Sequence, residues 1–214
     1  MIINVKIWIQ IFILDTNERL VFMGFRIITL YTVNTPYEDE VSGWEKSVSD
    51  LDLPYFIYQE KSRDSWGRNA QLKALCIKKA FDQFPKDNIV WVDIDARIYK
   101  YPNFFDEVKT DISCNIFSDN IDTNQLCSGT IFFRNIDRVK FFVDKWIKLN
   151  AKQVTKYGDQ DNLHTILKEA MSNKEITWYC LPQSYVKIFD RKSHQAADNI
   201  IVHYQASRRY KKKI

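Results

Sequence analysis

One stretch near the middle of the chain, residues 89–95, constrains the fold more than any other. It reads Ile-Val-Trp-Val-Asp-Ile-Asp, an apolar run that ends in two carboxylates one residue apart. Because side chains alternate along an extended chain, Asp93 and Asp95 point to the same side. Two carboxylates that close repel each other unless a proton or a cation lies between them. Open α/β sheets bind ligands at the carboxyl ends of strands, so the stretch predicts a divalent cation at a strand end.

The size and composition of the chain fit a single packed domain with short loops. Its 214 residues are 45% apolar and 27% charged, and they include only 5 Gly and 5 Pro. These proportions are ordinary for a globular protein, and the length suffices for one full core. No apolar run approaches the roughly 18 residues that a membrane-spanning helix requires. We expect the working domain to cover residues 23–214, and residues 1–22 to be an N-terminal extension with an edge strand.

A regular series of strands and helices surrounds the central stretch. Apolar runs predict buried strands over residues 26–33 and 54–58, and helical spacing of apolar residues predicts helices over 38–51 and 66–84. With the strand at 89–95, this order favours parallel pairing and right-handed crossovers, hence an α/β fold. Later in the chain we predict strands over residues 112–117, 130–133, 176–180, 185–189 and 200–204, and helices over 137–149 and 160–171.

The helix predicted over residues 66–84 is the clearest in the sequence. Its apolar side chains form one stripe, which predicts one buried face. Lys73, Lys78 and Lys79 lie mostly off this stripe. We therefore expect the three lysines to lie away from the buried face.

The four cysteines are far apart in the sequence. Cys76 and Cys114 lie within apolar patterns, and no two cysteines have CxxC spacing. The pattern predicts buried free thiols rather than a zinc site or a disulfide framework. Free thiols fit a reducing compartment, and we expect a cytoplasmic protein.

Two further polar motifs follow the acidic pair. Ser128 and Gly129 stand at the expected start of a strand, where a glycine allows a ligand to approach the backbone closely. A plain turn glycine is the alternative interpretation. Asp159 opens the helix predicted from residue 160, where an acid suits the N-cap position and the helix dipole. A carboxylate held at a capped helix end can also face a pocket, so both interpretations stay open.

The last predicted strand ends near His203, which is followed by hydroxyl and cationic side chains. A cation site with two carboxylates needs further ligands, and imidazole suits manganese as well as zinc. A histidine at a strand end can equally be structural. Residues 208–214 hold five cations and no acid. This tail predicts either a solvated, frayed end or the binding of phosphates, whether of a nucleotide or of nucleic acid.

These features occur in the order that GT-A glycosyltransferases show. A DxD at a strand end, Ser-Gly-Thr with an aromatic strand, Asp-Gln at a helix start and a strand-end His resemble glycosyltransferase family 8 and the nucleotide-diphospho-sugar transferase family. The resemblance covers residues 25–211. It implies a single Rossmann-like α/β domain whose mixed, mostly parallel central sheet is flanked by helices. It also implies a nucleotide-sugar donor, with UDP-sugar as the expected one, and Mn²⁺ or Mg²⁺ as the cation.

The matching positions imply a role for each motif residue. Asp93 and Asp95 match the metal- and diphosphate-binding acids, and His203 matches the late metal ligand. Asp159 and Gln160 match residues near the reacting carbon and the acceptor. The positions that match donor contacts are Tyr31, Thr32 and Asn34 on the uridine side, Arg68 and Lys73 at the start of the long helix, Ser128 and Gly129 beside the donor sugar, and Ser207, Arg208, Arg209 and Lys211 after the last strand, where the cations would close over the phosphates.

The resemblance to family 8 is incomplete at the end of the chain. That family usually ends His-x-x-Gly-x-x-Lys followed by Pro-Trp, whereas here Ala206 replaces the Gly, Arg209 replaces the Lys and Tyr-Lys replaces Pro-Trp. The charge is kept, which supports diphosphate binding. An inverting transfer needs a carboxylate base, for which Asp159 and Asp161 are the candidates. A retaining transfer needs no such base, and Gln160 would then only shield the sugar cation.

Two other classes of protein share parts of this pattern. Haloacid-dehalogenase-like phosphatases also place DxD after an apolar strand, but they have Thr or Val where this chain has Arg97. A non-catalytic module that binds nucleic acid or nucleotides could use the basic tail and the aromatic residues. Its charge, however, is concentrated in one short tail, and the acidic pair would oppose a phosphate backbone unless a metal covered it. The acceptor of a transferase stays open: a glycan, a lipid, a protein or a modified base in DNA.

Overall fold

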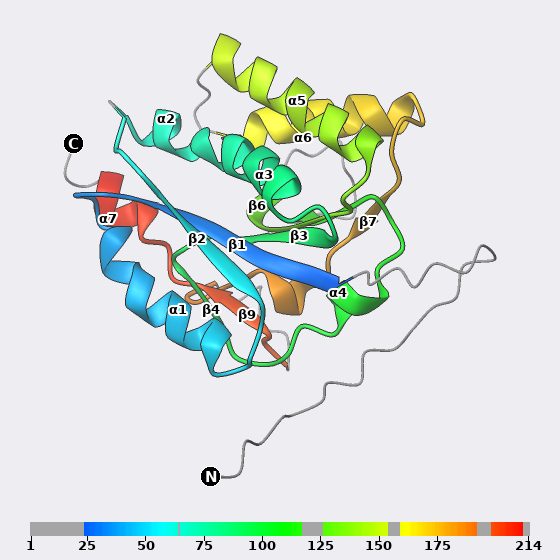
Figure 1. The fold of residues 1–214 in the computed structure, drawn as a ribbon. Helices are drawn as coiled ribbons and strands as arrows, with labels where there is room; N and C mark the ends of the chain where they lie inside the picture. Colours follow the sequence, from blue (N-terminus) through cyan, green and yellow to red (C-terminus); the bar gives the residue numbers. More distant parts are fainter. Residues whose placement is uncertain (1–23, 64, 117–125, 154–158, 192–197, 212–214) are drawn as a thin grey trace.

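The computed structural model describes residues 24–63, 65–116, 126–153, 159–191 and 198–211. Within these ranges the chain forms a layered α/β domain, with helices on one face of a central sheet and a small second sheet with further helices on the other (Figure 1). None of the helices in these ranges combines the length and the apolar character that crossing a bilayer needs. The extension and edge strand expected over residues 1–22 lie outside the described residues.

The central sheet has six strands in the order β2-β1-β3-β6-β5-β7. They are β1 (Gly24–Thr32), β2 (Tyr55–Glu60), β3 (Asp87–Val92), β5 (Ile112–Ile116), β6 (Leu126–Phe133) and β7 (Trp178–Cys180). β1 pairs in parallel with β2 and β3, and β5 pairs in parallel with β7, whereas β6 is antiparallel to β3 and β5. The predicted α/β fold with a mixed sheet, in which parallel pairs outnumber antiparallel ones, is confirmed.

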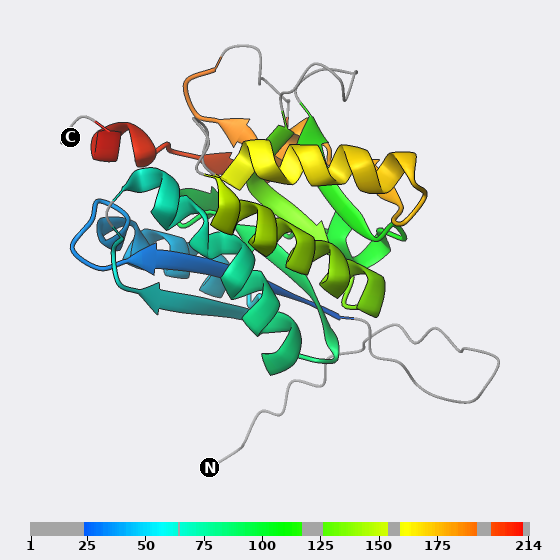
Figure 2. The ribbon, with the colours of Figure 1, turned by 90° about the horizontal axis from the view of Figure 1, so that it is seen from above.

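Helices α3 (Leu72–Gln83), α5 (Asp137–Lys152) and α6 (Asp159–Ser172) cover one face of this sheet, and the short α2 (Trp66–Ala70) precedes α3. Figure 2 shows α5 and α6 passing over the strands. In α5, the buried side chains of Val139, Phe142, Val143 and Trp146 recur at helical spacing, which explains why one side of the helix faces the core.

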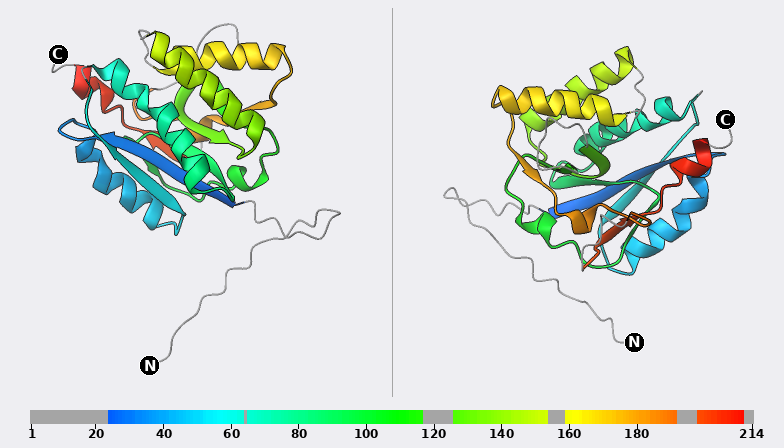
Figure 3. Two further views of the ribbon diagram at one scale, coloured as in Figure 1. Left: turned by 45° about the horizontal axis from the view of Figure 1, so that its top comes forward. Right: turned by 180° about the vertical axis from the view of Figure 1, so that it is seen from behind.

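The opposite face of the sheet packs against the 3-10 helix η1 (Glu38–Glu40), α1 (Val41–Ser49), α4 (Phe104–Glu107) and a second sheet of order β4-β9-β8. Its strands are β4 (Ala96–Ile98), β8 (Lys187–Ile188) and β9 (Ile201–His203). The 3-10 helix η3 (Gln183–Tyr185) precedes β8, and α7 (Ser207–Lys211) follows β9. Arg209 of α7 donates to the backbone oxygen of Pro36, so α7 lies beside the loop that follows β1 (Figure 3).

Antiparallel pairing of β4 with β9 places Ala96 opposite His203. The chain that follows the acidic pair therefore lies beside the last strand. This pairing is the step that brings the central motif and the C-terminal motif together.

Three details of the fold differ from the sequence prediction. The helix expected over residues 66–84 is two helices separated at Gln71, whose side chain donates to the backbone oxygen of Gln153 at 2.8 Å. This long-range bond attaches the junction to the end of α5, which local spacing does not reveal. The strand expected from residue 130 begins at Leu126, so Ser128 and Gly129 lie within it. The short elements β4 and α4 were not predicted, because three or four residues are too few to show a period.

All four cysteines are free thiols. Cys76 and Cys114 are buried, as the sequence predicts, and Cys127 is buried as well, whereas Cys180 is exposed.

Candidate active site

A cleft of about 370 Å³ opens where β1 and β3 end. β1 contributes Leu30 and Thr32, and the segment after β3 contributes Asp93 and Asp95. The size lies within the range of roughly 300–1,000 Å³ that is typical of small-molecule sites. The carboxyl ends of parallel strands are also where open α/β sheets bind their ligands.

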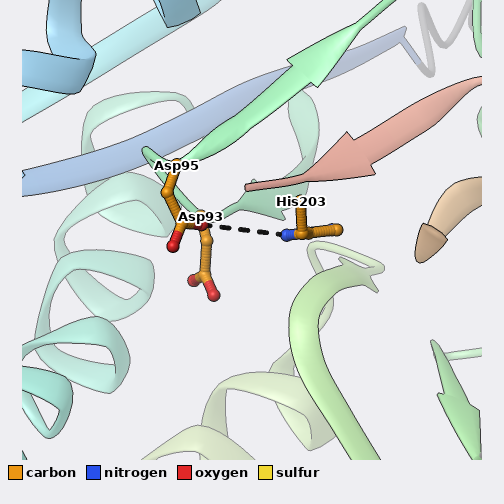
Figure 4. A group of neighbouring side chains, drawn as sticks. All are labelled: Asp93, Asp95 and His203. Atoms are coloured by element: carbon orange, nitrogen blue, oxygen red, sulfur yellow. Dashed lines mark ion pairs between the residues drawn. The ribbon is translucent and has the colours of Figure 1, made fainter. Parts of the chain in front are cut away.

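Asp93, Asp95 and His203 meet in this cleft (Figure 4). Each offers one ligand atom, and these atoms lie within 4.8 Å of one another. Nδ1 of His203 is 4.0 Å from Oδ1 of Asp95. Two carboxylates and one imidazole form a donor set that suits Mn²⁺ or Zn²⁺.

Backbone and side-chain groups fix the two carboxylates. The amide of Asp93 donates to the backbone oxygen of Gly129 at 2.8 Å, and the indole of Trp91 donates to Oδ1 of Asp93 at 2.7 Å. Oδ2 of Asp95 accepts from the backbone amide of Ala206 at 2.8 Å. Each acid is therefore oriented by groups that belong to other elements.

Gly129 makes room for the imidazole ring of His203. A Cβ atom at this position would lie 2.7 Å from Cε1 of His203 and 3.0 Å from its Nδ1. The close approach expected at Gly129 thus occurs, and the group that approaches is a side chain of the same protein. A glycine inside a strand often marks such a close contact.

The electrostatics of the cluster favour a cation. Burial, and after it the charge of Asp93, raises the pKa of Asp95 to about 7. Burial lowers the pKa of His203 to about 4, so its ring is neutral at physiological pH and keeps a lone pair. Oδ1 of Asp95 is buried and has no hydrogen-bond partner among the described residues. Because an unpaired buried carboxylate oxygen is costly, these residues fit a divalent cation between them.

Lys73 of α3 lies at the centre of a second set of contacts. Its Nζ is 3.1 Å from Oδ1 of Asp93 and 3.1 Å from Oδ2 of Asp159, and it donates to the backbone oxygen of Ser128 at 2.8 Å. Burial alone would lower the pKa of Lys73, but the carboxylates of Asp159 and Asp93 raise it, so the ammonium stays charged. The expectation that Lys73 lies away from the buried face is wrong, because these partners compensate for its burial.

Two of the three predicted catalytic residues line the cleft. Asp159 is buried at the start of α6, and Gln160 follows it. Burial raises the pKa of the Asp159 carboxyl, and the charge of Lys73 opposes this effect. Asp161 is absent from the lining, and its backbone oxygen accepts from the Thr165 hydroxyl at 3.0 Å.

The predicted donor contacts divide into two groups. The residues that line the cleft are Thr32, Lys73, Ser128, Gly129 and Ser207. Tyr31 does not line it, and its hydroxyl donates to Gln59 at 2.7 Å. Asn34, whose backbone amide donates to Glu38 at 2.8 Å, and Arg68 on the exposed side of α2 also lie outside the lining.

The basic tail is folded as far as the structure describes it, since α7 extends to Lys211. Arg208 pairs with Asp190 at 2.5 Å, and Arg209 pairs with Glu40. Of the two alternatives left open for the tail, the frayed end is wrong for α7, because carboxylates elsewhere in the fold hold its arginines. The side chain of Lys211 lies outside the described part of the chain.

Several lining residues carried no signal in the sequence. Tyr37 and Trp66 form part of the wall, and the indole of Trp66 donates to the Tyr37 hydroxyl at 2.9 Å. Arg191 lines the cleft from the segment after β8. The two aromatic residues follow short polar turns rather than strands, so only the three-dimensional fold brings them to the site.

The family of the chain follows from its C-terminal part. Residues 88–214 match the model of the nucleotide-diphospho-sugar transferase family. The match covers more than half of the chain and includes Asp93, Asp95, Asp159 and His203. The chain belongs to the nucleotide-diphospho-sugar transferase family. The protein is thus an enzyme that transfers sugars from nucleotide-sugar donors, and the phosphatase alternative is not supported.

Two solved structures share the GT-A fold of this nucleotide-diphospho-sugar transferase. A glycosyltransferase involved in the glycosylation of the major capsid of PBCV-1 superposes with a TM-score of 0.68 at 13% identity, over 88% of this chain and 98% of that chain. The apo-form glycosyltransferase GlyE of Streptococcus pneumoniae TIGR4 superposes with a TM-score of 0.56 at 14% identity, over 85% of this chain and 54% of that chain. At such identities the likeness extends to the fold alone. Among curated proteins, no sequence matches the chain significantly.

Proposed function

We propose that this transferase moves a sugar from a UDP-sugar to its acceptor with Mn²⁺ or Mg²⁺ held by Asp93, Asp95 and His203. The observation that carries this proposal is the buried Oδ1 of Asp95, which lacks a hydrogen-bond partner among the described residues and faces the neutral ring of His203. When bound, such a cation neutralises the charge that develops on a nucleoside diphosphate leaving group.

The residues around the cation site hold it in place before the donor binds. Trp91 and Lys73 fix Asp93, and the backbone of Ala206 fixes Asp95. Groups that are already oriented cost little reorganisation during the reaction, which is why preorganised sites accelerate the transfer of charged groups.

On the sugar side, we propose that Asp159 and Gln160 flank the donor sugar and the acceptor. Both line the cleft, and Lys73 joins Asp159 to Asp93 by two contacts of 3.1 Å. In an inverting transfer, Asp159 or Asp161 would take the acceptor proton. Asp159 would then have to give up its ion pair with Lys73, and Asp161 would have to turn toward the cleft.

On the nucleotide side, we propose that the aromatic wall of Tyr37 and Trp66 receives the base. Apolar ring surface suits a planar base, and the hydrogen bond between the two side chains holds the wall in place. We propose that Thr32, Ser128, Gly129 and Ser207, which line the cleft, contact the rest of the donor. Tyr31, Asn34 and Arg68 are candidates for a more distant ring of contacts.

The cations of α7 can reach the phosphates only after a rearrangement. Arg208 would have to leave Asp190, and Arg209 would have to leave Glu40. We propose that Arg208, Arg209 and Lys211 close over the diphosphate in this way once the donor is bound. The same ion pairs reduce the charge that the tail offers to nucleic acid, which weakens the alternative of a nucleic-acid-binding module.

One of the two solved structures suggests an acceptor to test first. The PBCV-1 glycosyltransferase is involved in the glycosylation of a major capsid. We therefore place a protein-linked glycan first among the acceptors to test, ahead of a lipid or a modified nucleobase.

A thermal-shift screen of sugar nucleotides, with and without Mn²⁺, tests the proposal. We expect a UDP-sugar to raise the melting temperature only when Mn²⁺ is present, and the Asp93→Ala variant to lose this shift. Asp50→Ala is the matched control, because the Asp50 carboxylate is exposed and forms a surface ion pair with Lys46 at 2.8 Å. A UDP-sugar shift that is independent of Mn²⁺ and of Asp93 would contradict the proposed cation site.

A further inference from the structure

The two ring nitrogens of His203 face different partners. Nδ1 lies 4.0 Å from Oδ1 of Asp95, on the side of the acidic pair. Nε2 lies 3.0 Å from Oγ1 of Thr130 on β6. An imidazole that binds a cation does so in its neutral form. One nitrogen therefore carries the proton, and the other offers a lone pair.

The Thr130 hydroxyl decides which nitrogen carries the proton. Thr130 is fully buried, and its hydroxyl donates to the backbone oxygen of Tyr185 at 2.9 Å. A hydroxyl has a single hydrogen, so once it is donated to Tyr185 the Thr130 oxygen can only accept from His203. The proton of the ring must then be on Nε2, and the lone pair must be on Nδ1.

We propose that Thr130 is a positioning residue that holds His203 in the Nε2–H tautomer, so that Nδ1 is free to bind the cation between Asp93 and Asp95. The proposal deepens the proposed function, since it rests on the cation site given there. Histidines that bind metals commonly donate their second ring N–H to a nearby acceptor, which fixes both the tautomer and the ring orientation.

Removal of the Thr130 hydroxyl should change which ring nitrogen of His203 carries the proton. The Nε2 proton would then lose the Thr130 oxygen and keep only the backbone oxygen of Tyr185 as an acceptor, which is less favourable. A proton on Nδ1, in contrast, would face Oδ1 of Asp95, which has no hydrogen-bond partner among the residues described. The ring would therefore change tautomer, and the proton on Nδ1 would occupy the position where the cation binds.

The contact between Thr130 and the ring of His203 also depends on the neighbouring elements. Gly129 leaves space for the ring, since a Cβ there would lie 2.7 Å from Cε1 of His203. Tyr185 ends η3, so its backbone oxygen links this segment to β6 and, through Thr130, to β9. The tautomer of His203 is thus fixed by the packing of three elements rather than by a local motif.

The first measurement is long-range ¹H–¹⁵N NMR of the full chain without metal, labelled at its three histidines. We expect the His203 proton on Nε2 in the wild type and in Thr130→Ser, which keeps the hydroxyl, and on Nδ1 in Thr130→Val. Thr29→Val is the matched control: Thr29 is a fully buried strand threonine whose hydroxyl has no hydrogen-bond partner in the described structure. If the His203 proton of the wild-type protein is found on Nδ1, the proposal is overturned, and no variant is needed.

The second measurement is Mn²⁺ affinity by titration calorimetry of the same four proteins. We expect Thr130→Val to weaken Mn²⁺ binding by about 10- to 100-fold, the loss typical for such supporting residues, and Thr130→Ser and Thr29→Val to bind like the wild type. A folded Thr130→Val protein with the wild-type tautomer and affinity contradicts the positioning role. A wild type that binds no Mn²⁺ contradicts the proposed function instead, while the NMR result still decides whether Thr130 sets the tautomer.

Discussion

Nζ of Lys73 on α3 lies 3.1 Å from Oδ2 of Asp159 on α6. The same ammonium lies 3.1 Å from Asp93, so one buried cation joins the predicted metal-binding acid to the predicted catalytic acid. Lys73 is 5% exposed and Asp159 is 4% exposed, so neither charge is compensated by water. The site therefore depends on this lysine for its stability as well as for its geometry.

Replacement of Lys73 by Met should destabilise the protein strongly. Removal of one partner of a buried ion pair typically costs about 3–5 kcal/mol, because the remaining charge stays buried without compensation. Urea unfolding monitored by circular dichroism measures the change. Lys78→Met is the matched control, since Lys78 lies on the same helix and forms an exposed ion pair with Asp144, which solvent screens. Equal stabilities of the two variants would contradict the role of Lys73.

Replacement of Gly129 by Ala should displace the ring of His203. The added Cβ would lie 2.7 Å from Cε1 of His203, too close for an undisturbed ring. We expect a loss of stability of about 1–3 kcal/mol, as for other overpacked sites. We also expect Mn²⁺ binding to weaken by about tenfold or more.

Titration calorimetry and thermal unfolding test the Gly129→Ala variant. Gly24→Ala provides the control, because among the described residues, its chain neighbours aside, no atom lies within 4 Å of the position that a Cβ at Gly24 would take. If Gly129→Ala bound Mn²⁺ like the wild type, His203 would not be constrained by this contact.

Asp111 should make stability depend on pH in the acidic range. Burial alone would raise the pKa of Asp111, but hydrogen bonds from Arg138 and from the Thr177 amide hold the pKa below its ordinary value of about 3.9. The stabilisation by the ionised Asp111 is thus present above the pKa of the unfolded chain, and it is lost as the pH falls through the lower folded pKa.

The Asp111→Asn variant measures this contribution. At about pH 7 we expect the variant to be less stable than the wild type by about 1.5–3 kcal/mol, the range for hydrogen bonds to a charged group. The difference should shrink as the pH falls below about 4, because the unfolded chain then takes up a proton at Asp111 before the folded protein does. Urea unfolding across this range is the measurement, and a difference that stays constant down to about pH 3 would refute the assignment.

Only one thiol of the four should react readily with a thiol reagent. Cys180 is exposed, whereas Cys76, Cys114 and Cys127 are buried. Burial also raises the pKa of Cys76 and Cys114 to about 12 and that of Cys127 to about 11, which keeps them as unreactive thiols. We expect Ellman's reagent to modify one thiol per folded chain in a fast phase, and Cys180→Ser to abolish this phase. A second fast thiol in the folded protein would show that the core opens.

The sequence predicts the framework of this enzyme well because the framework depends on local patterns. Long apolar runs and helical stripes locate β1, β3, α5 and α6 with small errors at their ends. The acidic pair and His203 were predicted to lie together from their motifs, and the structure places their ligand atoms within 4.8 Å of one another.

What the sequence does not predict depends on contacts between distant residues. Lys73 looks like an exposed helix residue, and its burial makes sense only beside Asp93 and Asp159. From the sequence, Gly129 could admit a ligand or be a plain turn glycine, whereas its need for space comes from His203 on another sheet. The ion pairs that hold α7 also join residues that are far apart in the sequence, as Arg209 and Glu40 are.

The pairing of β4 with β9 also bears on how the enzyme matures. A cation between Asp95 and His203 would cross-link two residues that are separated by a long stretch of chain. Closure of so long a loop costs entropy, which the binding of the cation would offset. A ligand that binds only the folded state stabilises that state by mass action. Removal of the cation with a chelator should therefore lower the apparent stability of the enzyme. During synthesis, a nascent chain would have no such cation site until His203 had left the ribosome, which makes metal loading one of the last events in its folding.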